Sequence, residues 1–282
     1  MRTLDASTLR RLKYVQARAG TPLDRFPDFL ILGPQRTGTT WLHAQLRFHP
    51  EIFLSEPKEI FFFSRIKNPE SPKFQSNELA WYLRLFRDPI WRWAAKNAIT
   101  LRRYGEPYRP RVRGEATASY AALDRDVIAE IAALNPAIKA ILMVRDPVER
   151  AWSHAKKDLV RKRKRRVEDV SDEEFHTFFR DDYQRRCARY GENYDNWAAH
   201  LGEGNLLMRV FDEIEAKPVE LLLDVMTFLG VSSDRRYVPA DVRESVNPTA
   251  SSRIPAQHRR FLEDLLRDDI TGLKKRFGLA WS

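Results

Sequence analysis

Short apolar runs alternate with longer amphipathic stretches along this 282-residue chain, and that order constrains its fold more than any other feature. Parallel strands joined by crossover helices produce such an alternation, because both faces of these strands are buried. We therefore expect a single α/β domain over residues 1–282, a doubly wound parallel sheet flanked by helices. The expected strands are 28–33, 51–55, 111–117, 138–144 and 205–211, and the expected helices are 39–48, 124–134, 147–160, 174–200 with a break near Gly191, 217–229 and 256–269.

Three segments stand outside this alternation. Residues 1–25 are expected to form an N-terminal helical extension, and residues 64–110, rich in Trp, Arg and Pro, a helical, aromatic insertion that lines a cleft. Exposed aromatic side chains beside arginines can stack on sugars, and the alternative is ordinary burial of the tryptophans. The basic run 161-RKRKRR-166 is interpreted as a solvated helix end or loop, with a polyanion-binding patch as the alternative.

Composition narrows the class of partner. The chain carries 49 basic and 39 acidic residues, and the net charge of +10 favours nucleotides, acidic or sulfated glycans, nucleic acids or membrane surfaces. A single cysteine, Cys187, excludes an intramolecular disulfide and a cysteine-cluster metal site. The first 20 residues lack the apolar core of a signal peptide, and no window reaches the ~18 apolar residues that span a bilayer. We expect a cytoplasmic protein without a membrane span.

The stretch 33-GPQRTGTTW-41 follows the first expected strand and has the glycine spacing of a phosphate-binding loop. A Walker A loop, G-x-x-x-x-G-K-[ST], has a lysine directly after its second glycine. Here Thr39 occupies that position, and Arg36 supplies a cation three residues earlier. The loop therefore predicts a P-loop-like fold and a phosphate site that differs from an ATP site.

Several donors in this loop converge on one anion. A strand end, two glycines and a helix N-terminus present backbone N–H groups to the same point. The hydroxyl groups of Thr37, Thr39 and Thr40 and the guanidinium of Arg36 add side-chain donors.

A second strand end also carries a cation. The strand 138–144 is followed by Arg145, where an ATPase places the acid that holds magnesium. An arginine at this position suits a second phosphate, and no metal is expected in the site.

These residues resemble the sulfotransferases that use 3′-phosphoadenosine 5′-phosphosulfate, including bacterial members and heparan sulfate N- and O-sulfotransferase domains. Gly33 to Leu42 follow the 5′-phosphosulfate motif G-x-x-[KR]-[ST]-G-[ST]-[ST]-x-[LW], and 144-VRDPVERAWS-153 follows the 3′-phosphate motif. The resemblance implies that Arg145 and Ser153 hold the 3′-phosphate, and that the product is adenosine 3′,5′-bisphosphate. It assigns the 5′-phosphosulfate to Gln35, Arg36, Thr37, Gly38, Thr39 and Thr40.

The segment 56-EPKEIFFF-63 resembles the stretch that carries the general base in these families. The resemblance implies that Glu59 accepts the acceptor's proton, that Lys58 contacts the acceptor, and that Arg36 stabilises charge on the departing phosphate. Without the resemblance, a surface glutamate beside Lys58 is the ordinary interpretation. A carboxylate in a semi-apolar pocket suits the role of base because its pKa can be raised toward the working pH.

Two further segments extend the resemblance. The stretch 113-RGEATASY-120 is similar to one that edges the acceptor site, which implies substrate contacts for Glu115 and Thr117. Many relatives have a lysine or histidine where this chain has Ala116, so more of the leaving-group stabilisation is expected from Arg36. The stretch 245-SVNPTASSRIP-255 resembles the late loop that closes on the cofactor, which implies a contact from Arg253, whose alternative is a solvent-facing loop arginine.

The resemblance implies sulfuryl transfer to a hydroxyl or amine of a carbohydrate or other small polar acceptor, with the insertion 64–110 lining the acceptor cleft. One alternative is a P-loop nucleotide kinase or other phosphotransferase. Another is a non-catalytic polyanion-binding protein that uses the basic run 161–166. A nucleic-acid partner is not expected, and the sequence leaves the acceptor, the choice between O- and N-sulfation, and the oligomeric state open.

Overall fold

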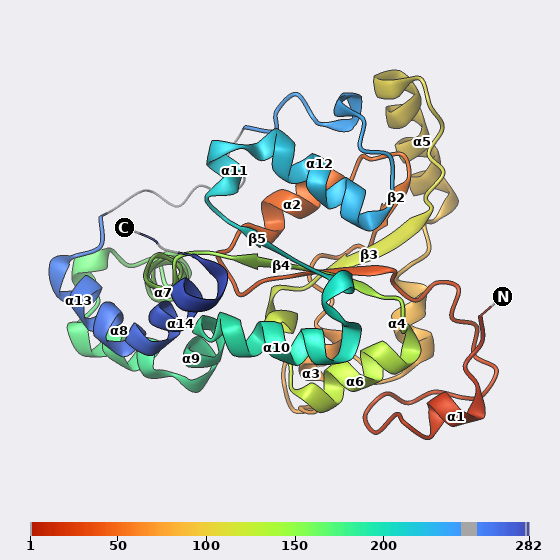
Figure 1. The fold of residues 1–282 in the computed structure, drawn as a ribbon. Coiled ribbons are helices and arrows are strands. Elements are labelled where there is room, and N and C mark those ends of the chain that lie inside the picture. The colour runs from red at the N-terminus through yellow and green to blue at the C-terminus, as the bar shows by residue number, and fades with distance from the viewer. Residues whose placement is uncertain (1, 244–252, 280, 282) are drawn as a thin grey trace.

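A computed structural model describes residues 2–243, 253–279 and 281, and it contains all five expected strands in one sheet (Figure 1). The strands are all parallel and lie in the order β2-β3-β1-β4-β5. The predicted doubly wound parallel sheet is therefore confirmed. The strands are β1 (Phe29–Leu32), β2 (Ile52–Leu54), β3 (Val112–Ala116), β4 (Lys139–Val144) and β5 (Leu206–Val210).

The central strand β1 is fully buried and pairs with both β3 and β4. After β1, the chain forms β2 and β3 on one side of β1 and then crosses to the other side, where it forms β4 and β5. The carboxyl ends of β1 and β4 therefore meet where the winding reverses, which is where open α/β sheets bind ligands.

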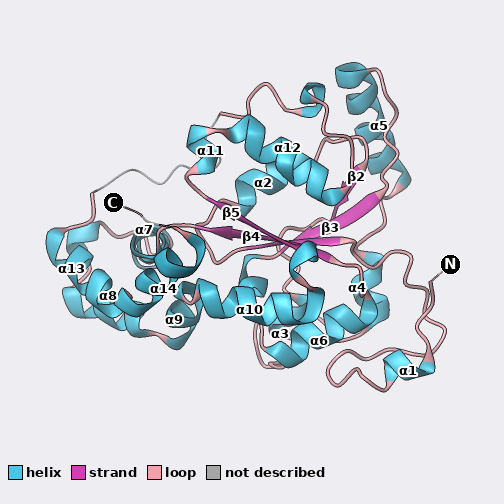
Figure 2. Ribbon diagram, viewed as in Figure 1, coloured by secondary structure: helices cyan, strands magenta, loops and turns pink. Residues whose placement is uncertain are grey.

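Helices cover both faces of the sheet (Figure 2). On one face lie α2 (Thr39–Leu46) and α12 (Pro218–Leu229), and on the other lie α6 (Arg125–Leu134) and α10 (Tyr190–Leu201). Alternate residues of β1 enter the two cores: Phe29 and Ile31 pack toward α2 and α12, and Leu30 and Leu32 pack toward α6 and α10. Burial on both faces explains why the sequence shows continuous apolar runs instead of a polar alternation.

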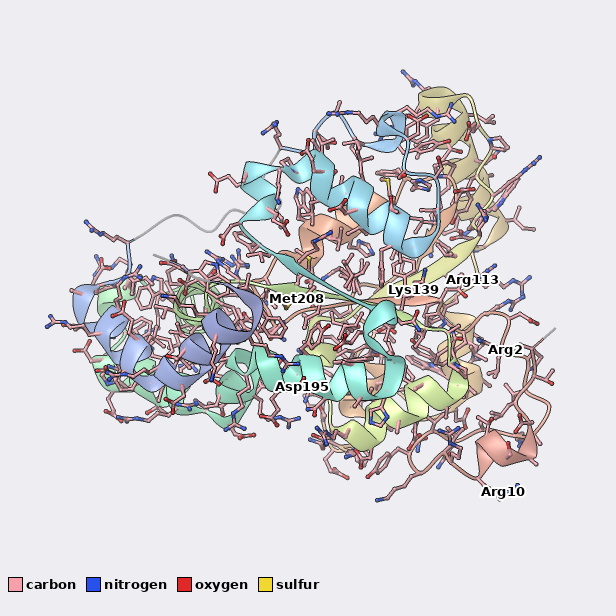
Figure 3. The ribbon with its side chains drawn as sticks, viewed as in Figure 1. Arg2, Arg10, Arg113, Lys139, Asp195 and Met208 are labelled. Carbon is pink, nitrogen blue, oxygen red and sulfur yellow. The ribbon has the colours of Figure 1, made fainter. Side chains whose placement is uncertain are left out.

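A group of helices beyond the end of β4 forms a third apolar core around Trp152 and Phe175. Asp195 of α10 accepts a hydrogen bond from Arg276 Nη1 at 2.6 Å, which ties the last helix to the sheet layer (Figure 3). These helices are α7 (Pro147–Ala155), α8 (Asp172–Arg180), α9 (Asp182–Ala188), α13 (Ala256–Leu265) and α14 (Arg267–Phe277).

Several expected helices differ in their bounds. The stretch 174–200 breaks at Arg189, which confirms the predicted break near Gly191, and it breaks once more at Asp181, because the Asp181 side chain accepts from Gln184 N and starts a new helix. Gly191 lies inside α10. The expected helix 147–160 continues past α7 as a π-helical segment, Lys156–Arg161, and the helix expected at 256–269 is divided between α13 and α14 at Leu266.

The two unusual segments behave differently. Residues 2–25 contain the four-residue helix α1 (Ala6–Leu9) and are otherwise irregular, so the predicted helical extension is wrong: Leu4, Val15 and Leu23 are buried in the main core. The insertion does contain helices, and α4 (Leu79–Arg84) is packed into the core. In contrast, α5 (Ile90–Tyr104) lies at the outer edge of the sheet beside β2 and buries only Thr100 (Figure 1).

The remaining helices are short: α3 (Phe62–Arg65) and α11 (Glu213–Ala216), with 3₁₀ turns at Ala118–Ala122, Val167–Asp169, Glu203–Asn205 and Arg235–Tyr237. Across the described residues, none of the helices combines the length and the apolar character needed to cross a bilayer.

Candidate active site

The loop between β1 and α2 closes tightly on itself at the carboxyl edge of the sheet. Gly33 has a φ of 151°, and a Cβ placed there would lie 2.6 Å from the backbone oxygen of Met143. Gly38 caps α2 with a φ of 94°, and its Cβ would lie 2.4 Å from Ile214 Cδ1. At Gly33 and Gly38 the backbone therefore packs against neighbouring residues so closely that a side chain would not fit. This tight loop leaves the N–H groups at the start of α2 available to an anion.

Replacing Gly33 by Ala is expected to destabilise the fold by ~2 kcal/mol or more, because the new methyl group meets a backbone oxygen of β4 that cannot move away. Gly204→Ala is the matched control, since a Cβ there meets nothing within 4 Å. Chemical denaturation of both variants measures the difference. Equal stabilities for the two would contradict this picture of the loop.

The structure brings together three residues from distant parts of the chain. Arg36 Nε donates to Ser153 Oγ at 2.9 Å, and Arg145 Nη1 donates to the backbone oxygen of Arg36 at 3.3 Å. Burial lowers the pKa of the Arg36 guanidinium, and the charges of Arg161 and Arg145 lower it further. Burial also lowers the pKa of Arg145. The positive charges of Arg36 and Arg145 repel each other at the carboxyl ends of the strands. An anion that carries more than one negative charge would relieve this repulsion, so the arrangement suits such an anion.

Two lysines from the π-helical segment 156–161 join this group, and sequence reasoning missed both. Burial lowers the pKa of Lys156, and the positive charges of Arg145 and Arg36 add to that effect. Burial also lowers the pKa of Lys157, which is raised in part by Glu59 and lowered by Arg36. Lys157 therefore lies within electrostatic range of both predicted catalytic residues. Its spacing of four residues from Ser153 was the available signal, because such residues share a helix face.

The predicted base and the phosphate loop are bridged by one lysine. Lys58 Nζ lies 3.6 Å from Glu59 Oε1 and donates to Thr40 Oγ1 at 3.2 Å. The side chains of Lys58 and Glu59 are 15% and 18% exposed, so both are largely buried. Burial lowers the pKa of Lys58, and the charge of Glu59 opposes that change. Lys58 thus fixes Glu59 relative to the first turn of α2.

Glu115 and Thr117, predicted to contact the acceptor, instead lie beneath the segment that carries Glu59. They are 1% and 0% exposed. Thr117 Oγ1 donates to Glu115 Oε1 at 2.6 Å and accepts from Ile60 N at 3.1 Å, and Tyr82 donates its hydroxyl to Glu115. This network holds the backbone next to Glu59 in place, so burial assigns the pair a supporting position and not an acceptor surface.

Burial raises the pKa of Glu115 to about 7 from its ordinary value of 4.5, and the charge of Glu59 adds to the rise. The folded chain therefore holds this proton more tightly than the unfolded chain. Stability from Glu115 is complete below pH 4.5 and is lost as the pH rises through 7, a change of ~3 kcal/mol.

A Glu115→Gln variant tests this sign. The free energy of unfolding of the variant minus that of the wild type should rise by ~3 kcal/mol between pH 4.5 and neutral or higher pH, because Gln does not titrate. The buried His43, whose pKa is lowered to about 4, titrates in the opposite sense but cancels in the difference. The exposed Glu70→Gln is the control and should show a flat difference. A flat difference for Glu115→Gln would contradict the assignment.

The remaining predicted residues occupy different environments. Gln35 Oε1 accepts from the hydroxyl of Tyr183, a residue of α9 that sequence reasoning missed. Thr37 is fully buried and donates to Pro34 O at 2.8 Å, so its hydroxyl closes the loop from within. Thr39 is buried in the first turn of α2. Arg253 is exposed, and because 244–252 lie outside the described residues, its contact with a cofactor stays a prediction.

The basic run 161–166 divides in two. Arg161 is the last residue of the π-helical segment, and its positive charge lowers the pKa of Arg36. The residues after it form local ion pairs, including Arg165 Nη1 with Glu174 Oε1 at 2.7 Å and Lys162 Nζ with Asp158 Oδ1 at 2.8 Å. These pairs favour the interpretation as a solvated loop over a polyanion patch.

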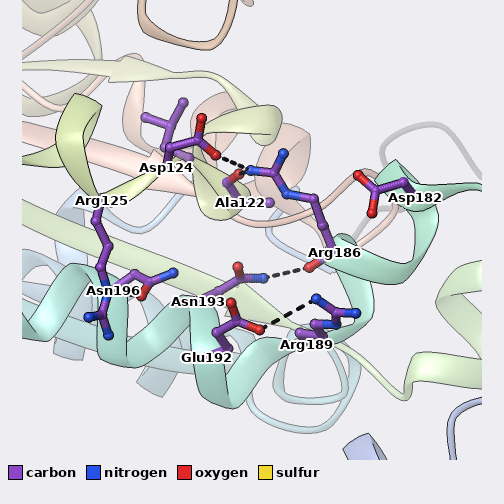
Figure 4. Close-up of a pocket in the computed structure, with 10 residues that line it drawn as sticks. Ala122, Asp124, Arg125, Asp182, Arg186, Arg189, Glu192, Asn193 and Asn196 are labelled. Carbon is purple, nitrogen blue, oxygen red and sulfur yellow. Dashed lines mark hydrogen bonds and ion pairs between the residues drawn. The ribbon is translucent and has the colours of Figure 1, made fainter.

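A polar pocket of about 270 Å³ lies between the start of α6 and helices α9 and α10 (Figure 4). Its charges are paired internally: Arg186 Nη2 lies 2.7 Å from Asp124 Oδ1, and Arg189 Nη1 lies 3.7 Å from Glu192 Oε2. None of the predicted site residues lines it. Its lining is Ala122, Leu123, Asp124, Arg125, Asp182, Arg186, Arg189, Glu192, Asn193 and Asn196.

Comparison with known proteins gives a consistent result. Residues 27–235 match the model of the sulfotransferase family. Over 228 residues the chain is 28% identical to the human bifunctional heparan sulfate N-deacetylase/N-sulfotransferase 2, covering 76% of this chain and 23% of that protein. The chain therefore spans about a quarter of the length of such curated relatives.

Solved structures resemble the whole fold. A sulfotransferase from Alicyclobacillus acidocaldarius is 25% identical with a TM-score of 0.62, covering 90% of this chain and 97% of that one. The sulfotransferase domain of the Synechococcus PCC 7002 olefin synthase is 17% identical with a TM-score of 0.53, covering 96% and 98%, and shows likeness of fold alone.

Proposed function

The chain belongs to the sulfotransferase family, and from that premise we propose that it moves a sulfuryl group from 3′-phosphoadenosine 5′-phosphosulfate to a hydroxyl or amine of an acceptor with a polar, carbohydrate-like group. One observation carries the proposal. Arg36, Arg145 and Ser153 converge where the winding of the sheet reverses, and Lys58 links Thr40, at the start of α2, to Glu59. Such a site offers two phosphate positions and a base.

The described residues fit this donor. The loop 35–40 offers backbone N–H groups at the start of α2 for the 5′-phosphosulfate, and its tight path depends on Gly33 and Gly38, where a Cβ would meet Met143 or Ile214. In this proposal Arg145 and Ser153 hold the 3′-phosphate, and their contacts with Arg36 at the edge of the sheet support it. The donor supplies an activated sulfur–oxygen bond, and the protein's residues supply position, charge and proton transfer.

In the proposed step the acceptor oxygen or nitrogen forms a bond to sulfur while the bond from sulfur to the 5′-phosphate oxygen breaks. Glu59 takes the acceptor's proton, which keeps the nucleophile neutral after attack. Arg36 and Lys58 lie on the side of the phosphate loop, where negative charge develops on the departing bisphosphate.

Transfer of labelled sulfur from the donor to a panel of sugar, amine and alcohol acceptors, with a chelator present, tests the proposal. We expect labelled product and adenosine 3′,5′-bisphosphate in equal amounts. Transfer of phosphate from ATP with magnesium, without any transfer of sulfur, would contradict the proposal and support the alternative, a phosphotransferase.

A further inference from the structure

Helix α5 (Ile90–Tyr104) presents an uncovered apolar face to solvent. Among the described residues, all four strongly exposed large hydrophobic side chains lie on this helix: Ile90 at 86%, Trp91 at 68%, Trp93 at 45% and Leu101 at 46%. Exposed alanines at 94, 95 and 98 connect them along one side. Scattered exposed hydrophobic residues need no explanation, but a continuous face on one helix marks a binding surface.

The C-terminal end of this face is basic. The sequence of α5 has no Asp or Glu, and of its four basic residues Arg92 and Lys96 form ion pairs with Glu56 and Asp88. Arg102 and Arg103 are exposed. An interfacial helix combines this apolar face, rich in Trp, with Lys and Arg beside it, and such a helix lies in the surface of an anionic bilayer. The net charge of +10 on the chain acts in the same direction.

The aliphatic residues of α5 distinguish between two possible binding partners of this face, a membrane and an acidic polysaccharide. Sugars bind to aromatic rings flanked by hydrogen-bonding side chains, whereas this face continues from Trp91 into Ile90, three alanines and Leu101. Such a surface offers little to a glycan and suits hydrocarbon. A bilayer is therefore the occupant that the composition of α5 favours.

The helix is tied to the segment that carries Glu59. Arg92 Nη2 lies 3.4 Å from Glu56 Oε2, and Glu56 precedes Glu59 by three residues. Docking of α5 on a bilayer would bring the segment 56–59 close to the lipid head groups.

We propose that α5 docks on an anionic membrane surface, and that the acceptor is a hydroxyl- or amine-bearing head group of a membrane lipid. The docking stands independently of the transfer reaction, and the identity of the acceptor rests on the proposed function. A glycolipid fits both features. Its polar head group reaches the Glu59 site, and the bilayer that holds the lipid contacts the apolar face of α5.

Sedimentation of the full chain with vesicles tests the docking. Wild type should bind phosphatidylcholine vesicles that contain phosphatidylglycerol, and bind phosphatidylcholine alone more weakly. Ile90→Ser with Trp91→Ser should lower partitioning about tenfold or more, because the inserted side chains are lost. Trp91→Phe should retain binding. The control is Arg260→Ala with Arg267→Ala, which removes the same kind of surface charge from α13 and α14 and should leave partitioning within about twofold.

Three outcomes overturn the docking. One is no binding of wild type to anionic vesicles. Another is a dimer in light scattering that the Ile90 and Trp91 double variant abolishes, which would make the face an interface between copies. The third is heparin binding that depends on these two residues, with no vesicle binding.

The acceptor is tested with a glycosyl diacylglycerol in anionic vesicles against the free methyl glycoside. Wild type should sulfate the vesicle-bound sugar at least about tenfold faster, and the double variant should lose that advantage. Equal rates for the two acceptors would overturn the lipid assignment. Binding of adenosine 3′,5′-bisphosphate by the double variant should be unchanged. Failure of wild type to bind that nucleotide would count against the proposed function, while the vesicle result would still decide the docking.

Discussion

Replacing Glu59 by Gln is expected to lower the rate of sulfuryl transfer by about two to four orders of magnitude, because the amide cannot accept the acceptor's proton. Glu59 lies 3.6 Å from Lys58 Nζ, which itself contacts the start of α2, so the variant keeps its surroundings. Binding of adenosine 3′,5′-bisphosphate should change little. Steady-state rates and calorimetry on the same preparation measure the two effects.

Glu56→Gln is the matched control, because Glu56 lies on the same segment but faces Arg92 on α5. Its rate toward a water-soluble acceptor should stay within about threefold of the wild type, in keeping with the small contribution of a half-exposed ion pair. A Glu59→Gln variant with full activity would remove Glu59 from the reaction.

Arg36→Ala is expected to reduce the rate by about two to three orders of magnitude, the cost of removing one preorganised donor from a developing negative charge. The variant loses the hydrogen bond from Arg36 Nε to Ser153 Oγ at 2.9 Å but keeps the backbone oxygen that accepts from Arg145, so its effect reports on the guanidinium. Arg36→Lys should recover part of the rate. Donor affinity and turnover, measured together, separate binding from stabilisation of the leaving group.

Arg47→Ala removes an exposed cation from the far end of the same helix and serves as the control. It should leave the rate unchanged within about twofold, because a solvated charge beyond a Debye length contributes little. If Arg36→Ala behaves like Arg47→Ala, the working cation lies elsewhere, and Lys58 or Lys157 becomes the candidate.

The sheet could be predicted from sequence because its central strands are buried on both faces. The runs at 28–33 and 138–144 became β1 and β4 with bounds that differ by one residue at most ends. The resemblance grouped Arg145 with Ser153 and assigned Arg36 to the other phosphate, whereas the structure joins Arg36 Nε to Ser153 Oγ at 2.9 Å and Arg145 Nη1 to the backbone oxygen of Arg36 at 3.3 Å.

Helix breaks and burial were less predictable. A side-chain cap at Asp181 decides where one helix ends, and the segment that carries Lys156 and Lys157 is π-helical where a continuous α-helix was expected. Neither the cap nor the π-helical segment changes the spacing of hydrophobic residues, so neither could be predicted from that spacing. Tryptophans show the same limit: Trp81 packs against the core, whereas Trp91 is exposed, although both lie in one aromatic segment.

The lysine missing after Gly38 now has a physical explanation. Lys58 reaches the first turn of α2 from the loop after β2, and Arg36 reaches Ser153 from within the phosphate loop. We propose that these two cations, from two loops, take the place of one lysine at the Walker A position. A donor with a phosphosulfate and a separate 3′-phosphate matches that distribution of charge.

Calorimetric titration with adenosine 3′,5′-bisphosphate and with adenosine 5′-monophosphate, in the presence of a chelator, tests whether the site holds two separate phosphates. We expect the bisphosphate to bind without magnesium, the monophosphate to bind at least about tenfold more weakly, and Arg145→Ala to remove this preference. Equal affinity for the two nucleotides, or binding of ATP that requires magnesium, would contradict this expectation.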